Sequence, residues 1–344
     1  MADHLNFKEA HQKLIMIRYI IYRLLVSIPT LLAISIIGFG IIQLPEGDFL
    51  DRKIQELEEM YGDSSSLAQI EGLRDRYGLD EPMWKQYFTW ISGFVVGDFG
   101  ESFEYEQEVN RLIWDRLLFT IMIALGSLLF TYIVAIPVGI IAATHQYRLA
   151  DNLLSFLSFI GMSLPGFLVA LGLMVFVFNS FQIPLFGLFS AQYEGAPWSW
   201  DKFLDLLKHL WIPVVVVGLN GTAGLMRIMR ANLLDVLGQQ FVLTARAKGL
   251  RELTVVIRHA ARIAINPLIS ILGMSLPNIL SGATIVSIVL GLPTIGPLLL
   301  RSLITEDIYL ASTLLLMFSL LLIIGNIIAD ILLAWADPRI RFDK

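Results

Sequence analysis

The chain has 344 residues, of which 56% are hydrophobic and only 16% are charged. The mean hydropathy of +0.69 lies far from the balance of an ordinary soluble domain, so lipid is expected to be the main solvent of this chain. The formal net charge of -5 argues against nucleic acid as a partner. The chain contains no cysteine, which excludes disulfides and thiolate metal sites.

The first apolar block runs over residues 19–44 and is long enough for a helix to cross the roughly 30 Å hydrocarbon core of a bilayer. Its only charge, Arg23, lies near one end, where the side chain can reach the headgroups. A cleaved signal peptide is the alternative, but the block is longer than a typical signal core and no cleavage site follows it directly. Residues 1–18 are then expected to form a cytoplasmic tail.

A polar segment follows the first block, over residues 45–114, with six basic and sixteen acidic residues. This excess of acidic residues predicts that the segment lies outside the cytoplasm, where it would form a small domain against the outer membrane face. Its aromatic residues, Trp84, Tyr87, Phe88 and Trp90, are interpreted as anchors at the membrane interface rather than ligand contacts.

Five further apolar blocks lie within residues 115–335, at about 117–143, 153–180, 209–228, 266–292 and 309–335. Basic residues gather in the tail at 1–18 and in the loop at 229–265, and by the positive-inside rule both are cytoplasmic. The short C-terminal tail, 336–344, falls on the same side. The sequence therefore predicts an all-α membrane protein with six transmembrane helices and a small extracytoplasmic domain after the first.

Several predicted spans contain residues that break or bend helices. The freed backbone groups must pack against protein or line a wet cavity, because the hydrocarbon offers no hydrogen-bond partner. These residues are therefore candidates for a translocation path, the alternative being small residues that only let helices approach closely. The candidates are Ser163, Pro165, Asn220, Ser275, Pro277 and Asn278.

The loop at 229–265 carries the run T-A-R-A-K-G-L at residues 244–250, followed by Arg258-His259-Ala260 and then Asn266-Pro267. This pattern resembles the coupling loop in the permeases of binding-protein-dependent ABC importers, in the dipeptide, oligopeptide and nickel-type branch. The outer segment with Gly97-Asp98-Phe99-Gly100 and the ending Asp337-Pro338-Arg339 are similar to that branch as well. The resemblance implies a type I ABC importer permease fold.

In this family the coupling loop docks on an ATPase, so the resemblance assigns that role to Thr244, Ala245, Arg246, Ala247, Lys248, Gly249 and Leu250. The residue types fit, because small residues allow close approach and basic residues offer charge to a partner. Leu243 and Thr244 depart from the wider permease pattern E-A-A-x-x-x-G, whereas Ala245 and Gly249 keep their places. A basic loop that only fixes topology is the alternative.

The resemblance also implies partners: a second homologous permease, two cytoplasmic ATP-binding subunits and an extracytoplasmic solute-binding protein, with membrane lipid around the spans. Acidic residues of the outer segment, Glu104, Glu106 and Glu108, are candidates for docking the binding protein. The chain has no G-x-x-x-x-G-K-[ST] phosphate loop and no H-E-x-x-H or G-x-S-x-G motif. We therefore expect no enzymatic activity and no cofactor in this chain, with ATP hydrolysis on separate subunits.

The expected function is that of a permease subunit in the inner membrane, forming half of a pathway for a small solute. Short peptides are the first expectation for the solute, with oligosaccharides or nickel as alternatives. A secondary carrier that needs no ATPase is a further alternative, but ion-coupled carriers keep ionisable residues deep in their helices. The predicted span interiors contain almost none.

Overall fold

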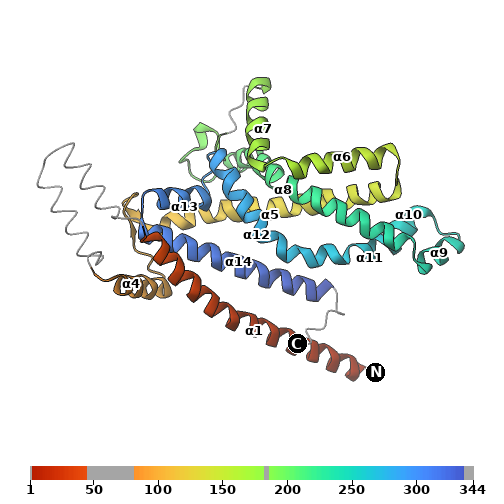
Figure 1. Ribbon diagram of the computed structural model, residues 1–344, viewed down its shortest axis with the longest axis horizontal. Coiled ribbons are helices and arrows are strands. Elements are labelled where there is room, and N and C mark those ends of the chain that lie inside the picture. The colour runs from red at the N-terminus through yellow and green to blue at the C-terminus, as the bar shows by residue number, and fades with distance from the viewer. Residues whose placement is uncertain (1, 45–80, 182–185, 337–344) are drawn as a thin grey trace, which may run out of the picture. The chain divides into compact units, whose positions relative to one another are not determined.

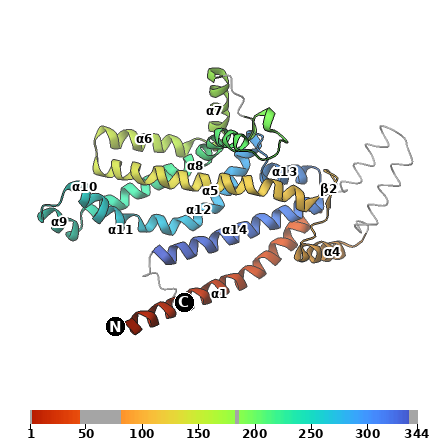
Figure 2. The ribbon, with the colours of Figure 1, turned by 180° about the vertical axis from the view of Figure 1, so that it is seen from behind.

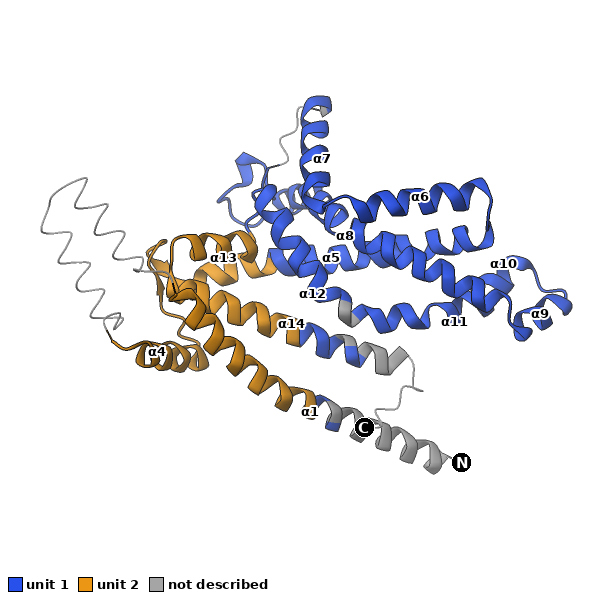
Figure 3. Ribbon diagram, in the orientation of Figure 1, with its two compact units in different colours: residues 1–20, 119–293, 324–344 blue, residues 21–118, 294–323 orange. Residues whose placement is uncertain are grey.

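The computed structural model of this protein describes residues 2–44, 81–181 and 186–336 (Figure 1). The chain divides into two compact units (Figure 3). The core unit comprises residues 1–20, 119–293 and 324–344, and the hairpin unit comprises residues 21–118 and 294–323. Part of the predicted outer domain, 45–80, and the tail at 337–344 lie outside the described residues.

The hairpin unit is built around a helix that follows the first span in the described chain. This helix, α4 (Met83–Val96), ends at Gly97, whose φ of 85° places it in the left-handed region that glycine adopts without strain. Trp90 on α4 is 2% exposed, stacks on Phe39 at 5.4 Å between ring centroids, and donates from Nε1 to Thr313 Oγ1 at 3.1 Å. The other elements of this unit are part of α1 (Ala2–Ile42), β1 (Glu101–Ser102), β2 (Gln107–Glu108), the start of α5 (Val109–Thr144), α13 (Ile295–Ile304) and the start of α14 (Ile308–Ala336).

The strands β1 and β2 form a short antiparallel hairpin, with Glu101 opposite Glu108 and Ser102 opposite Gln107. This hairpin is a small departure from the predicted all-α fold, within a described chain that is otherwise mostly helical. The label β2 marks it in Figure 2. The hairpin brings the three candidate docking glutamates onto one short turn.

The core unit is held together by close packing between α5 and α8. Gly139 on α5 lies so close to α8 that an added Cβ would come within 2.7 Å of Met229, so only glycine fits there. Thr131 on α5 donates from Oγ1 to the carbonyl of Gly218 at 3.0 Å, which joins the same two helices at a second point. The main helices are the rest of α5, α6 (Leu149–Ser163), α7 (Gly166–Phe181), α8 (Trp200–Leu237) and α12 (Asn266–Val289), with a 3-10 turn at Ala191–Tyr193.

Four helices of the described chain are long and apolar enough to cross a membrane, or up to six if each bent pair counts as one span. The predicted span at 153–180 is not one straight helix, because α6 and α7 meet at an angle of 103° (Figures 1 and 2). The bend lies at Leu164, whose backbone is extended, since a residue before proline is disfavoured in the α region. Pro165 thus breaks the helix where the sequence predicted a break.

The predicted coupling loop is itself helical. It contains α9 (Gln240–Ala247), α10 (Glu252–Thr254), a π-helical stretch (Val255–Ala261) and α11 (Arg262–Ala264). The segment from Glu252 to Ala264 meets the next helix at a bend of 41°, at Ile265, directly before Asn266-Pro267. The loop is therefore a short helical hairpin that leads directly into α12.

Candidate functional site

The candidate site centres on the hairpin formed by α9 and the helical segment that follows it. The chain reverses at Gly249, whose φ is 75°. Gly249 N–H donates to the carbonyl of Arg246 at 2.9 Å, so the turn closes directly behind α9. A residue with a Cβ costs about 1–2 kcal/mol in the left-handed region, which explains why glycine stands at this turn.

The inner face of the hairpin packs onto the core unit. Val242 and Ala245 are buried, and they share one apolar cluster with Leu233 and Val236 of α8 and with Val256. Ala245 therefore serves internal packing, whereas the sequence interpretation placed it against a partner protein. The hairpin is held firmly on the end of α8, as a docking element requires.

The outer face of the hairpin exposes large apolar side chains. Exposed apolar side chains with basic residues beside them form a candidate interaction surface. Lys248 and Arg251 are exposed beside this cluster. Its members are Phe241, Leu243, Leu250 and Leu253, with exposed fractions of 37%, 48%, 41% and 72%.

Arg246 is already paired within the hairpin. Its Nη2 and Nε lie 2.6 and 3.1 Å from the two carboxylate oxygens of Glu252. Thr244 donates from Oγ1 to the carbonyl of Gln240, one turn earlier in α9. Arg246 and Thr244 therefore shape the hairpin, while Lys248 and Arg251 are exposed at its turn without a described ion pair.

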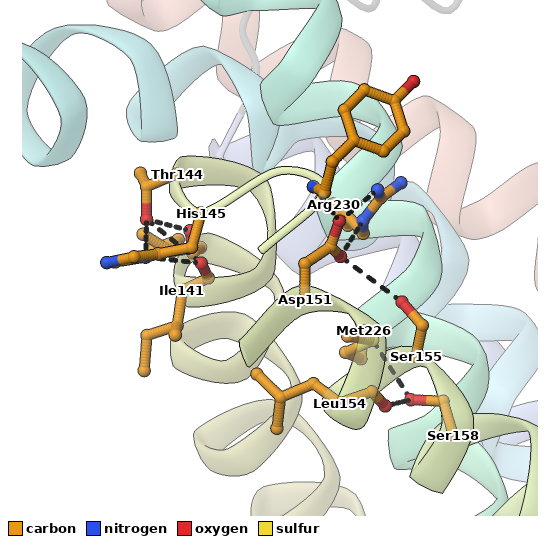
Figure 4. A network of polar contacts seen from close by, with 11 residues as sticks. Ile141, Thr144, His145, Asp151, Leu154, Ser155, Ser158, Met226 and Arg230 are labelled. Carbon is orange, nitrogen blue, oxygen red and sulfur yellow. Dashed lines mark hydrogen bonds and ion pairs between the residues drawn. The ribbon is translucent and has the colours of Figure 1, made fainter. Parts of the chain in front are cut away.

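An ion pair that the sequence analysis missed ties α6 to the helix that carries the hairpin (Figure 4). Asp151 accepts from Arg230 Nε at 2.6 Å and from Nη2 at 2.7 Å, and from the backbone N–H of Tyr147 at 2.9 Å. The Asp151 side chain is only 3% exposed. In the sequence, Asp151 is visible only as an acidic residue at the start of an apolar block. No sequence pattern indicates that Arg230 is its partner.

The candidate path residues all lie in the core unit but form no single cluster. Ser163, Pro165, Asn220 and Asn278 are exposed, whereas Ser275 and Pro277 are half-buried. Ser163 and Ser275 each donate to a carbonyl four residues earlier in their own helices. The exposed members lie at the end of α6, at the break between α6 and α7, and on α8 and α12.

The three candidate docking glutamates lie on the β1–β2 hairpin in different settings. Glu104 accepts from Arg301 Nη2 at 2.7 Å and from its Nε at 3.0 Å, so its charge is paired within the hairpin unit. Glu106 stands at the turn with a φ of 50°, and Glu108 is exposed on β2. Glu108 thus offers a simpler test of docking than Glu104.

The comparisons with known proteins decide the family. Residues 135–342 match the family described as "Binding-protein-dependent transport system inner membrane component", and residues 16–124 match the N-terminal part of such membrane components. The chain belongs to this family. It is therefore a permease subunit of an ABC importer of the dipeptide and oligopeptide branch, with the type I permease fold and a place in the inner membrane.

Three relatives show how far the similarity extends. The chain is 35% identical over 333 residues to the oligopeptide transport system permease protein AppB of Bacillus subtilis, covering 95% of this chain and 100% of that protein. It is 31% identical over 329 residues to the oligopeptide permease protein OppB of Haemophilus influenzae, with the same coverage. It is 32% identical over 327 residues to the glutathione permease protein GsiC of Escherichia coli K12, again with 95% and 100% coverage. The similarity thus includes both units.

Proposed function

We propose that this chain forms half of the translocation pathway of an ATP-driven importer of short peptides. The substrate class is supported by the printed names of its relatives, which are oligopeptide, dipeptide and glutathione permeases similar over nearly their full length. Peptides and glutathione share amide bonds and free carboxylates, whereas no relative named here transports sugars or nickel. A second homologous permease forms the other half of the pathway.

The observation that carries the mechanism is the exposed apolar face of the α9 hairpin, rigidly packed on the end of α8. Two ATP-binding subunits dock on such hairpins, one on each permease, and hydrolyse the ATP. Closure of the ATPases moves the hairpin, and because Val242 and Ala245 are packed against α8, that helix moves with it. The pathway then changes between inward-facing and outward-facing states.

The orientation follows from this role. The α9 hairpin and both chain termini lie in the cytoplasm, and the β1–β2 hairpin lies on the other side, where a solute-binding protein delivers the peptide. The basic residues of the α9 hairpin and the acidic residues near β2 support this orientation. Since the chain has no cysteine, a single cysteine at Lys248 or Glu108 can be labelled from one side in sealed vesicles. Labelling of both from the same side would contradict the orientation.

The turn at Gly249 tests the coupling role. We expect Gly249→Val to lower peptide uptake several-fold while the ATPases remain bound and active, because valine is strained at a φ of 75° and the turn must change shape. No atom lies within 4 Å of an added Cβ there, so the effect would arise from the backbone and not from a clash. The measurement is ATP-driven uptake together with ATPase activity in vesicles containing the whole complex.

Gly238 provides the matched control for this test. Its φ is -81°, in the region that every residue adopts, and an added Cβ would meet only ordinary contacts. Gly238→Val is therefore expected to keep most of the uptake. Equal uptake by the two variants would remove the proposed coupling role of the turn.

Glu108 tests the docking of the binding protein. Glu108→Lys is expected to slow uptake most strongly at low salt, because the charge on an exposed strand steers a charged partner. Glu104→Lys would also break the pair with Arg301, so it reports on folding as well as docking. An uptake rate that Glu108→Lys leaves unchanged at every salt concentration would exclude this residue from docking.

A further inference from the structure

Arg227 on α8 is a charged residue of the core unit to which the proposed function assigns no role. It is exposed, and its guanidinium lies 4.9 Å from the centroid of the Phe159 ring on α6. Nη1 also lies 3.5 Å from the sulfur of Met162. Within the described residues no carboxylate forms an ion pair with Arg227, whereas Arg230, three residues later, is paired with Asp151.

The depth of Arg227 follows from the composition of α8. Residues 209–226 contain no Asp, Glu, Lys or Arg. At about 1.5 Å per residue this stretch is roughly 27 Å long, close to the thickness of the hydrocarbon core. The backbone of Arg227 therefore lies at one boundary of the apolar stretch.

The direction of the Arg227 side chain follows from the register of α6 against α8. Asp151 contacts Arg230, Ser158 contacts Met226, and an added Cβ at Gly161 would meet Leu219 and Ala223, so the two helices run antiparallel. The residues that the guanidinium contacts, Phe159 and Met162, are level with the part of α8 that precedes Arg227. The side chain thus points away from the α9 hairpin and into the apolar stretch, as helical side chains lean toward the N-terminus.

This direction is opposite to that of an arginine that reaches for headgroups. A cation aimed into the hydrocarbon is costly when it faces lipid, and such residues face a bundle interior or a water-filled cavity. Asn220 is exposed on the same face of α8, seven residues before Arg227. The exposed face that carries Asn220 and Arg227 is therefore polar within the hydrocarbon region. A helix face in contact with lipid would be apolar there.

We infer that Arg227 lines the translocation path and binds the carboxylate of a peptide in transit. The guanidinium lies over the Phe159 ring and its Nη1 contacts the Met162 sulfur, whereas within the described residues no hydrogen bond engages its Nε and Nη2 edges. Those edges match the two oxygens of a carboxylate, which is the group that arginine binds with paired hydrogen bonds. The inference rests on the proposed function for the identity of the substrate, but the wetness of this face can be tested without it.

The first experiment measures whether the face is wet. Because the chain has no cysteine, Arg227→Cys places a unique thiol in this subunit of the complete complex. We expect a small, charged thiol reagent to modify this cysteine. When the thiol reagent carries a carboxylate, excess peptide should slow the modification, because the peptide occupies the same path. Ile133→Cys is the matched control, since Ile133 is 60% exposed on the apolar surface of α5 and should stay unmodified. Equal lack of reaction at the two positions would overturn the inference.

The second experiment measures uptake of trialanine at saturating binding protein, so that recognition by that protein does not limit the rate. Arg227→Gln is expected to lower the maximal rate about tenfold, the effect of losing one charge-assisted contact, with the half-saturating peptide concentration unchanged. Arg227→Lys should restore much of the rate, because it keeps the charge. Lys208→Gln, which removes a charge elsewhere on α8, should have little effect.

The outcomes separate this inference from the proposed function. An unchanged uptake rate with Arg227→Gln would overturn the proposed binding of a carboxylate by Arg227. So would an equal loss of rate in Arg227→Lys and Arg227→Gln. A wild-type complex that takes up no peptide would instead contradict the proposed function, while modification of Arg227→Cys would still show a wet path at this position.

Discussion

Two buried carboxylates, one in each unit, are satisfied in different ways. In the core unit Asp151 is paired with Arg230, which neutralises its charge and fixes α6 against α8. In the hairpin unit the described hydrogen bonds to Asp307 come from neutral donors, among them the Ser102 hydroxyl at 2.6 Å and the backbone N–H groups of Glu104 at 3.2 Å and Leu310 at 3.1 Å. The first carboxylate depends on one cation 79 residues away, and the second depends on neutral groups, two of them more than 200 residues away and one in the first turn of α14.

The difference has an electrostatic consequence. An ion pair keeps both partners charged, so removing one leaves a buried charge without compensation. Among the described residues Asp307 has no such ion-pair partner, and its burial raises the pKa of its carboxyl above the ordinary value, although the hydrogen bonds oppose this shift. Removal of one charge should therefore cost more stability at the paired site than at Asp307.

The largest expected effect is at the paired site. Arg230→Met should lower the free energy of unfolding by about 3 kcal/mol, because Asp151 is left buried and unpaired. We take the lower end of the usual range because the Arg230 side chain is 25% exposed. Thermal and denaturant unfolding of the purified protein in detergent measures the change.

The control is the double variant Asp151→Leu with Arg230→Met. It removes both charges and should recover most of the lost stability, since a well-packed apolar pair replaces a buried ion pair at little cost. A double variant as unstable as Arg230→Met alone would show that hydrogen bonding to Tyr147 and Ser155, and not charge, governs this site.

The next effect is at the unpaired site. Asp307→Ala should lower the free energy of unfolding by about 2 kcal/mol, because the Ser102 hydroxyl and two backbone N–H groups lose their acceptor. Asp307→Asn keeps one acceptor oxygen and removes the charge, so its cost should be smaller. A larger loss for Asn than for Ala would contradict this account. The same unfolding measurements apply.

The smallest effect is the dependence of stability on pH. Since the pKa of Asp307 is raised in the folded state, its contribution is fully present below the unfolded pKa of about 3.9 and is lost as the pH rises through the folded value. Wild type should therefore lose stability relative to Asp307→Asn as the pH rises from about 4. Unfolding midpoints of both proteins across this range measure the difference, and a constant difference would contradict a raised pKa.

Several features of the candidate site follow from short stretches of sequence. The break at Pro165 and the reversal at Gly249 depend on the backbone preferences of one or two residues, and the sequence predicted the first of them. The directions of side chains do not follow in this way. Ala245 was expected to face a partner, but the packing of α9 on α8 turns it inward.

The sequence by itself determined the membrane class, the family and the helix break at Pro165, because hydropathy, motifs and backbone preference are local properties of the chain. The tertiary structure alone decided which charges are used internally. Arg230 finds Asp151 across 79 residues and Arg301 finds Glu104 across 197, whereas Arg227 contacts an aromatic ring. Such pairings depend on the register between helices, which is set by packing and cannot be counted along the sequence.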